Sequence, residues 1–467
     1  MRGSRMWAAG CSLLLALAWT GAARADIAIQ HWLAKSGARV YYVEAPQLPL
    51  LDVRVVFDAG SARDAGKAGL AQLTNTLLDQ GAGELSADQI AERLDGLGAQ
   101  LSSDSLRDMA LVGLRTLSDE PVRRQALELM ALVLAKPRFA PEVFERERQR
   151  MLVGLDAQEQ SPGAVASREF MRELYGAHPY ASPPEGTRDS LSALTPAEAA
   201  AFHKQYYTAA NAIVAIVGAV NREQAEGIAE LLTAGLPPGG AAPALPPVPD
   251  LAAARTVHIE RDSAQTHIYI GQPVMARGDP DHFPLTVGNH TLGGSGLVSR
   301  LSHEVREKRG LAYSVYSYFQ PLRGRGPLLA VVQTKPGEAA QSLQLLHDNI
   351  RRYAAEGSTP QELEAAQKNL TGGFALNLDS NKKILDQIAS IGFYGLPLDW
   401  LNRYNERVLA VKPEDIRRAF AARVQPDKLL TVIVGPKPVA TPTVVRTEAA
   451  APATGGLPTP AAAPGAR

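Results

Sequence analysis

The residues whose types and spacing could do chemistry are concentrated in a segment that runs from Thr291 to Phe319. Two of them, Arg306 and Tyr313, lie seven residues apart near the expected junction of a helix and a strand. Arg306 falls in the last helical turn before Gly310, a C-terminal capping glycine. Tyr313 falls at the start of the strand, so a sharp junction brings a guanidinium and a phenol together. The alternative is that Arg306 complements the helix dipole and Tyr313 packs with its hydroxyl in water.

The elements expected to position this pair follow from hydrophobic periodicity. The helix places Leu297, Leu301 and Val305 on one face. The strand after Gly310 alternates Leu311, Tyr313, Val315, Ser317 and Phe319 on one side. A glycine cluster, Gly293, Gly294 and Gly296, precedes the helix. These glycines could let a substrate backbone approach closely, or could form an ordinary turn into the helix.

The histidines give no self-contained active site. The chain has nine histidines, and none of them forms HExxH or HxxEH with a second histidine. His303 and Glu307 are four residues apart on the expected helix, where they could share a metal or form a helical ion pair. The sequence has no GxSxG motif, P-loop or GxGxxG motif.

Composition narrows the class of protein. The 467 residues include 48 basic and 48 acidic side chains, which argues against a nucleic-acid-binding protein. The single cysteine, Cys11, excludes a cysteine-ligated zinc cluster. Residues 1–25 have the pattern of a signal peptide: Arg2 and Arg5, an apolar run, and a small-x-small site that ends at Ala25. No later run has 18 apolar residues, so we expect no membrane span and a periplasmic or secreted protein.

The remaining chain divides into two similar segments. Residues 236–250 hold six prolines and are expected to form an extended linker without regular structure. The tail, 437–467, is rich in proline and alanine and is expected to be disordered. Segments 26–235 and 251–436 share an order of helix, strand and glycine, in which Pro196 and Pro413 lie 217 residues apart, as do Gly218 and Gly435. This match favours a duplicated domain.

Strands and helices are mixed within each segment. In the first, 40–44 and 51–58 are expected to form a strand pair, and 110–114 and 212–217 are further strands. Helices are expected at 68–79, 86–97, 120–135 and from Thr195 to Tyr206. The prediction is an α+β fold of two homologous domains, each a mixed, mainly antiparallel sheet with helices packed on one face.

Three blocks of sequence resemble the M16 family of zinc peptidases, the relatives of insulinase, pitrilysin and the mitochondrial processing peptidase. They are GLAQLTNTLLDQGAG at 69–83, the segment from His178 to Gly218, and LGGSGLVSRLSHEVREKRGLAYSVYS at 292–317. The likeness extends over nearly all of 30–436 and is specific to the half-sized members. It implies two domains of the M16 type.

The departures from the family pattern remove its metal site. Zinc-binding members carry HxxEH where this chain has Gln72, Asn75 and Thr76, and their third ligand, a glutamate, falls on Gly154. Glutamine and threonine are poor zinc ligands, and asparagine cannot serve as a general base. The resemblance therefore implies that this chain holds no cofactor and cleaves no peptide by itself.

The second half keeps the arginine and tyrosine that the family places across the cavity from the metal. Arg306 and Tyr313 match an arginine–tyrosine pair of the family, and such donors suit the oxyanion of a tetrahedral intermediate. The family stretch that pairs with a substrate strand lies near 101–105, where Ser102 and Ser103 replace the usual asparagine and alanine. Gly293, Gly294 and Gly296 are the other substrate-binding candidates.

These expectations define one hypothesis and two rivals. The chain is predicted to be the zinc-free subunit of an exported heterodimeric M16-like peptidase. A partner subunit with HxxEH is expected to supply the zinc and the general base, and Arg306 and Tyr313 are expected to act in trans on a peptide. The first rival is an inactive peptide-binding or scaffolding protein. The second is a peptidase that is active alone with metal at an unforeseen place, such as His303 and Glu307.

Overall fold

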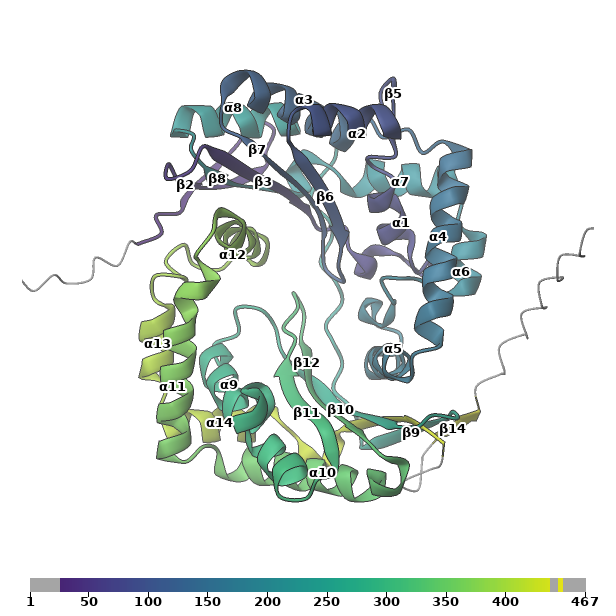
Figure 1. Cartoon of the computed structure of the whole chain (residues 1–467), viewed down its shortest axis with the longest axis vertical. Coiled ribbons are helices and arrows are strands. Elements are labelled where there is room, and N and C mark those ends of the chain that lie inside the picture. Colours follow the sequence, from purple (N-terminus) through teal and green to yellow (C-terminus); the bar gives the residue numbers. More distant parts are fainter. Residues whose placement is uncertain (1–25, 437–443, 448–467) are drawn as a thin grey trace, which may run out of the picture.

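The computed structural model describes residues 26–436 and 444–447, and two six-stranded sheets organise it. The first sheet has the strand order β1-β2-β8-β3-β7-β6 and the second has the order β14-β9-β13-β10-β12-β11. Figure 1 shows one sheet above the other, with helices on their outer faces and at both sides. The expected signal peptide, 1–25, lies outside the described residues, as does the tail except for its four-residue strand.

The first half comprises strands β1 Gln30–Leu33, β2 Arg39–Glu44, β3 Leu50–Phe57, β4 Gly81–Ala82, β5 Leu85–Ser86, β6 Gln100–Ser105, β7 Ala110–Leu117 and β8 Ala212–Gly218. Its helices are α1 Leu70–Thr76, α2 Ala87–Gly96, α3 Glu120–Ala135, α4 Pro141–Glu159, α5 Pro162–Tyr175, α6 Arg188–Ala193, α7 Pro196–Tyr206 and α8 Arg222–Thr233.

The second half comprises strands β9 Arg255–Glu260, β10 Thr266–Met275, β11 Ala312–Phe319, β12 Gly326–Thr334, β13 Leu430–Gly435 and β14 Val444–Thr447. Its helices are α9 His282–Asn289, α10 Ala339–Glu356, α11 Pro360–Phe374, α12 Asn381–Tyr394, α13 Tyr404–Ala410 and α14 Pro413–Arg423, and short 3-10 and π turns lie between α9 and β11.

Local signals account for the helix boundaries. Ser86 caps α2 through a reciprocal bond with Gln89, and Thr195 caps α7 through Glu198 in the same way. Helices α7 and α14 begin at Pro196 and Pro413 and have the same length. The repeat predicted from this spacing is confirmed, since the strands occupy equivalent positions in the two sheets.

One strand pairing in the sequence-based prediction is wrong. The strands near 40–44 and 51–58 do not pair with each other, because β8 lies between β2 and β3. Strand β8 is parallel to β2 and antiparallel to β3, and all seven of its residues are buried. A fully buried strand carries no register signal that would reveal its neighbours, so the order could not be deduced from local patterns.

The two halves cover each other's sheets. Helix α12 of the second half packs Leu385, Ile388 and Ile391 against β2, β3 and β8 of the first sheet. Helix α5 of the first half packs Val165, Phe170 and other apolar residues against β10 and β13 of the second sheet. Figure 1 shows α12 and α5 on opposite sides between the sheets. Because each buried Leu, Ile or Phe contributes about 1.5–3 kcal/mol, this exchange holds the halves firmly together.

The proline-rich segment 236–250 differs from the expected unstructured linker. It has no helix or strand, as predicted, but it is fixed along the first half. Val248 is buried beside α5, His178 Nε2 lies 2.9 Å from the Pro246 carbonyl, and Ala242 N donates to Asn211 Oδ1 at 3.0 Å. Prolines remove backbone donors, so such a segment can lie against a surface without strand pairing.

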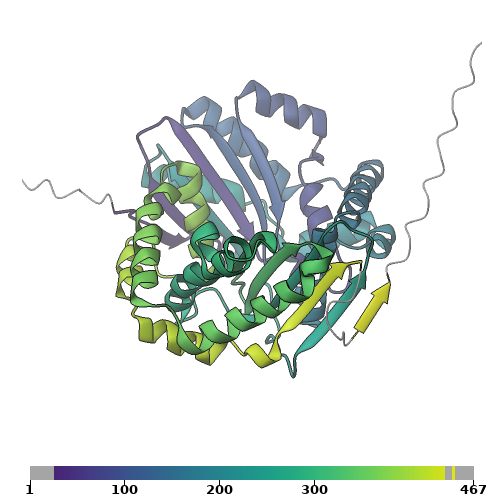
Figure 2. The ribbon, with the colours of Figure 1, turned by 60° about the horizontal axis from the view of Figure 1, so that its bottom comes forward.

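The tail also differs in part from the expected disorder. Residues 444–447 form β14, which pairs in parallel with β9 at the edge of the second sheet. Figure 2 shows β14 as the yellow strand at this edge, separated from the yellow interior strand β13 by β9. The rest of the predicted tail, 437–443 and 448–467, lies outside the described residues.

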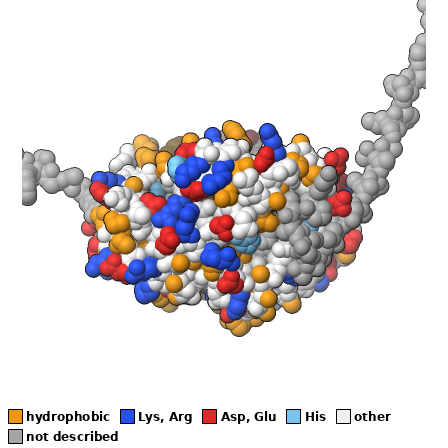
Figure 3. Space-filling view, turned by 90° about the horizontal axis from the view of Figure 1, so that it is seen from below, with side chains coloured by type: hydrophobic (Ala, Val, Ile, Leu, Met, Phe, Trp, Pro, Cys, Tyr) orange, Lys and Arg blue, Asp and Glu red, His pale blue; other side chains and the backbone are white. Residues whose placement is uncertain are grey.

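Charge is mixed on the visible surface of the second half. Figure 3 shows basic and acidic side chains interspersed on the face seen from below. In the second half, Arg351 pairs with Asp427, and Arg418 with Asp281. Within the described ranges, no helix is long and apolar enough to cross a bilayer.

Candidate functional site

The helix that carries the altered metal motif is anchored by a buried carboxylate. Asp64 accepts hydrogen bonds from the Ala71 and Gly69 amides, at 2.8 and 3.0 Å, at the start of α1. The Ser182 hydroxyl donates a third at 3.0 Å. Burial raises the pKa of Asp64 to about 7, against the opposing effect of these hydrogen bonds. Asp64 therefore fixes the orientation of α1.

Asn75, at the position of the family's general base, serves as a structural link. The side chain is 2% exposed. Its Nδ2 donates to the Asp104 carbonyl at 2.8 Å and more weakly to Leu111 O at 3.4 Å, and its Oδ1 accepts from the Tyr207 hydroxyl at 2.9 Å. Both ends of the amide are thus satisfied inside the protein. Burial raises the pKa of Tyr207, so its hydroxyl stays a donor.

The other three positions of the motif do not form a metal site. Gln72 and Thr76 are half-buried on α1, and Gly154 is exposed on α4, where an added Cβ would meet no atom within 4 Å. Their donor set consists of one amide, one hydroxyl and no third side chain, which does not fit zinc. Over the described ranges, no group of three or more His, Cys, Asp or Glu side chains could hold a metal ion.

Strand β6, which contains Ser102 and Ser103, lies at the edge of the first sheet. It pairs with β7, and no other described strand lies beyond it. Both serines are exposed, and Ser102 Oγ makes a long contact of 3.5 Å with the Gly113 carbonyl. An exposed edge presents main-chain donors and acceptors to another extended chain.

The structure brings Arg306 and Tyr313 together. The Arg306 Cζ lies 5.5 Å from the centre of the Tyr313 ring, within the range of a cation–π contact. Tyr313 is 82% exposed, although the alternating pattern placed it with the buried Val315. The difference arises from a shift in the β11–β12 register between Ala312 and Ser314, which turns Tyr313 outward. Such bulges redirect side chains and are frequent beside active sites.

The helix that carries Arg306 is less regular than predicted. A 3-10 turn at Gly296–Val298 comes first, and a π turn at Ser302–Glu307 follows. Leu301 and Val305 are buried as expected, but Leu297 is 58% exposed and does not share their face. The 3-10 turn ends at Ser299, whose extended backbone (φ −77°, ψ 158°) separates Leu297 from the turn that carries Leu301 and Val305, and a 3.6-residue period does not anticipate such a break.

The charges next to the pair are mutually compensated. Lys308 Nζ and Arg309 Nη1 lie 2.7 and 2.8 Å from the Glu304 carboxylate. These two cations lower the pKa of Glu304 to about 2. Arg306 has no carboxylate partner among the described residues, so its charge is available. His303 Nδ1 and a Glu307 carboxylate oxygen lie 2.8 Å apart on the exposed surface, the contact that the helical-pair interpretation expected.

The three glycines have separate roles. Gly293 is buried, and a Cβ there would lie 2.3 Å from Ser317 Oγ and 2.5 Å from Ser317 N on β11. Its lack of a side chain is therefore required for packing. Gly294 and Gly296 are exposed, and Gly296 has a φ of +62°, which favours glycine. These two remain accessible to a ligand.

A polar cluster between the halves was not anticipated from the sequence. The buried Asp108 carboxylate accepts from the Tyr180 hydroxyl at 2.7 Å, the Arg323 amide at 2.8 Å and the Tyr394 hydroxyl at 3.2 Å. Tyr180 belongs to the first half, and Arg323 and Tyr394 to the second. Asp108 lies in the turn that follows β6, so the cluster fixes this edge relative to the second sheet. No local pattern marks a residue whose partners lie 72, 215 and 286 residues away along the chain.

Comparisons with known proteins agree with this arrangement. Residues 39–188 match the family described as insulinase (peptidase family M16), and residues 193–370 match the peptidase M16 inactive domain. The crystal structure of a peptidase M16 inactive domain from Pseudomonas fluorescens is similar, with a TM-score of 0.85 and 38% identity over 89% of this chain and 100% of that one.

Curated relatives carry two kinds of name. An uncharacterized zinc protease of Mycobacterium tuberculosis is 30% identical over 78% of this chain and 83% of its own length. A non-peptidase homolog of Helicobacter pylori is 24% identical over 85% of this chain and 92% of its own length. From the matched domains, the shared fold and the altered site, the chain belongs to the M16 peptidase family as a member that lacks the catalytic zinc motif.

Proposed function

We propose that this chain is the zinc-free subunit of an exported heterodimeric peptidase of the M16 type. A partner subunit with an intact HxxEH motif would hold the zinc and the general base. This chain would contribute Arg306 and Tyr313 as donors to the oxyanion that forms when a peptide bond is attacked. Its edge strand β6 and the accessible Gly294 and Gly296 would contact the peptide substrate.

The observation that carries the proposal is the contrast between the two parts of the family site. At Asn75 the base is replaced by an amide that is fully used in internal hydrogen bonds. Arg306 and Tyr313, in contrast, are adjacent, and Tyr313 points out to solvent at a bulge. Arg306 and Tyr313 are therefore accessible to a ligand, whereas the amide of Asn75 is not.

Exposed apolar side chains support a partner surface near these positions. Val153, next to Gly154, is 68% exposed, and Val298, next to the glycine cluster, is 86% exposed. Adjacent exposed apolar side chains, such as Val298 and its neighbour Leu297 at 58% exposure, are typical of protein–protein interfaces, whereas a single one such as Val153 is ordinary on a protein surface. A subunit that closes over these positions would bury them.

The first experiment is to tag the chain in its native host and to identify by mass spectrometry what co-purifies with it at stoichiometric level. The proposal expects a chain of similar size with an intact HxxEH motif. Peptide hydrolysis by the reconstituted complex is then measured for Arg306→Ala and Tyr313→Phe. Loss of one oxyanion donor typically lowers turnover by about 10²–10³.

Matched control substitutions distinguish a loss of oxyanion stabilisation from a loss of activity through altered surface charge or stability. Arg309→Ala removes a nearby arginine that pairs with Glu304, and Tyr316→Phe removes a hydroxyl from the same strand. Both should retain activity within a factor of about three, since neither group is placed to meet the oxyanion. Full activity of Arg306→Ala and Tyr313→Phe in the complex would refute the shared-site mechanism.

A second candidate is an inactive peptide-binding or scaffolding protein. The name of the Helicobacter pylori relative, a non-peptidase homolog, favours it. This candidate predicts that the chain is recovered alone or with itself only, and that an excess of it protects peptides from unrelated proteases. Recovery with an HxxEH-bearing partner, together with the effect of Tyr313→Phe, would decide against it.

A further inference from the structure

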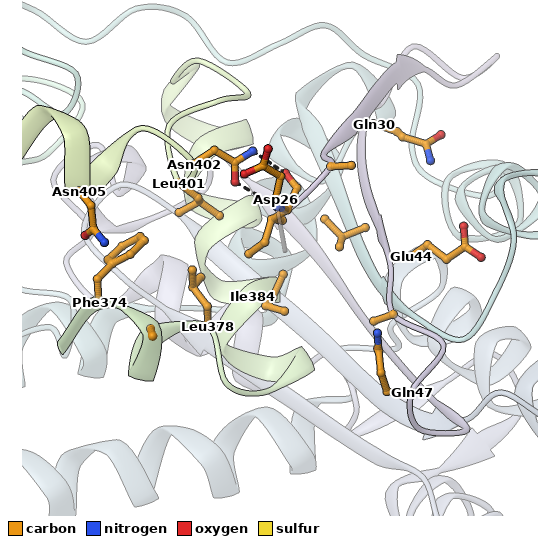
Figure 4. Close-up of a pocket in the computed structure, with 15 residues that line it drawn as sticks. Asp26, Gln30, Glu44, Gln47, Phe374, Leu378, Ile384, Leu401, Asn402 and Asn405 are labelled. Carbon is orange, nitrogen blue, oxygen red and sulfur yellow. Dashed lines mark hydrogen bonds between the residues drawn. The ribbon is translucent and has the colours of Figure 1, made fainter. Parts of the chain in front are cut away.

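Both ends of the described chain are attached to the second half, but in different ways. At the N-terminal end, Asn402 Oδ1 accepts from the Ile27 amide at 3.0 Å and Asn402 Nδ2 donates to the Ile27 carbonyl at 3.1 Å, the two dashed bonds in Figure 4. At the C-terminal end, the strand β14, Val444–Thr447, pairs with β9. The first contact is made by one side chain, whereas the second covers the edge of a sheet.

The other edges of the two large sheets have features that protect them. An edge strand presents unpaired N–H and C=O groups to any extended chain, so soluble proteins use short strands, charged residues or bulges at such places. Strand β1 has only four residues. Strand β6 has the polar sequence QLSSDS with an exposed acid, Asp104, and β11 has a bulge between Ala312 and Ser314. Each of these features disfavours pairing with the same edge of a second copy.

Strand β9 has none of these features along its centre. All six of its residues, Arg255–Glu260, pair with β13 in an unbroken register. Val257, His258 and Ile259 are each at most 5% exposed, and the charged residues stand only at the two ends of the strand. Without the tail, β9 would therefore be a regular edge with an apolar centre, the type that pairs with other chains.

The tail covers this edge with a strand that is itself protected. Figure 2 shows β14 at the outer side of the second sheet, beyond β9. It has only four residues, and one of them is Arg446. Eight residues, 436–443, connect it to the end of β13. A connection of this length gives an attached strand an effective concentration of about millimolar, so a second copy at micromolar concentration competes at a disadvantage of about 10³.

We infer that the C-terminal tail prevents β9 from pairing with a second copy of the chain. Two uncovered β9 edges would meet in antiparallel orientation, because a two-fold axis relates equivalent surfaces. In the register centred on His258, Val257 of one copy lies opposite Ile259 of the other. Pairs of β-branched apolar residues on opposite strands are favourable, so the edge is complementary to itself. The product is a closed dimer.

The test is a pair of proline substitutions in the tail strand. Neighbouring residues of a strand direct their N–H groups to opposite sides, so either Val445 or Arg446 donates toward β9, and Val445→Pro/Arg446→Pro removes that bond in both cases. Ala449→Pro/Ala450→Pro, outside β14, is the matched control. Residues 26–467 are used for all three proteins, because the apolar run of the expected signal peptide would itself associate. Circular dichroism and thermal unfolding check that each variant is folded.

Light scattering at micromolar concentration measures the mass of each protein. Val445→Pro/Arg446→Pro should have twice the mass of the natural chain, and the control should have the same mass as the natural chain. An unchanged mass of the first variant, or a doubled mass of the control, would overturn the inference.

A synthetic peptide with the sequence of the tail strand, TPTVVRTEA, shows whether β9 is the surface that pairs. It should restore the natural mass of Val445→Pro/Arg446→Pro. It should also bind this variant at least about tenfold more tightly than the natural chain, whose edge is already occupied. The peptide TPTVPPTEA should do neither. Equal binding of the first peptide to both proteins, or a doubled mass that this peptide does not reverse, would show that β9 is not the surface protected by the tail.

Discussion

Asn75 provides a direct test of whether the former catalytic position now has a structural role. We predict that Asn75→Asp, which preserves the size of the side chain, strongly destabilises the protein at neutral pH. The bond from Tyr207 to Oδ1 survives the change. The donor to the Asp104 carbonyl at 2.8 Å becomes an oxygen, so two acceptors face each other at a position that is 2% exposed.

The size of the destabilisation by Asn75→Asp depends on whether the new carboxyl holds a proton. When it is protonated, this carboxyl can donate to the Asp104 carbonyl and restore the lost bond. Holding that proton at pH 7.5 on a group with an ordinary pKa of about 3.9 costs about 1.4 kcal/mol for each of about 3.6 pH units, or about 5 kcal/mol. At pH 5 the same cost is about 1.5 kcal/mol. An ionised carboxylate at this site also costs several kcal/mol.

The direction in which the stability of Asn75→Asp changes with pH follows from the difference in proton binding between its folded and unfolded states. Burial and the facing carbonyl raise the pKa of the new carboxyl in the folded state above its unfolded value. The folded variant then binds more protons than the unfolded one, so its stability falls as pH rises from about 4 toward the raised pKa. Relative to the natural chain, the penalty should therefore grow with pH.

Urea unfolding of both proteins at pH 5, 6 and 7.5 measures this difference. Asn377→Asp, at an exposed site, is the matched control and should change the free energy of unfolding by less than about 0.5 kcal/mol. A penalty for Asn75→Asp below about 1 kcal/mol at pH 7.5, or one that does not depend on pH, would refute the structural role of the amide.

Three further predictions concern other parts of the structure. Gly293→Ala should lower the free energy of unfolding by about 1–3 kcal/mol, because the added Cβ would clash with Ser317. Gly154→Ala, on the open face of α4, is the control and should be neutral or stabilising. Equal effects of the two substitutions in urea unfolding would contradict the packing role of Gly293. Burial raises the pKa of Asp64 to about 7, so the contribution of Asp64 to stability is complete below about pH 3.8 and is lost as the pH rises through 7. Asp64→Asn should therefore flatten the dependence of the free energy of unfolding on pH over that window. An unchanged pH dependence would contradict this. Asp108→Ala leaves two hydroxyls and an amide without their acceptor, so it should lower the free energy of unfolding by about 2–4 kcal/mol. It should also increase amide hydrogen exchange at Tyr180, Arg323 and Tyr394. Exchange that stays unchanged at all three residues would show that Asp108 does not join the halves.

Local patterns in the sequence were sufficient for the repeat and for five of the helices, α1, α2, α3, α7 and α14. Proline and an acidic residue in the first turn mark α7 and α14, and a capping serine marks α2. These signals depend on neighbours a few residues apart, so they survive without tertiary information. The resemblance to the M16 family assigns Gln72, Asn75, Thr76 and Gly154 to the zinc-site positions, and their residue types then show that the required donor groups are missing.

Tertiary structure alone decided how the remaining parts meet. The exchange of α5 and α12 between the sheets, and the convergence of Tyr180, Arg323 and Tyr394 on Asp108, join residues that no periodicity relates. The outward direction of Tyr313 depends on a register shift against β12, and strand register is set by pairing with another strand. The sequence by itself thus determined which chemical groups this protein has, and long-range packing decided which of them are exposed, because burial is a property of the whole fold.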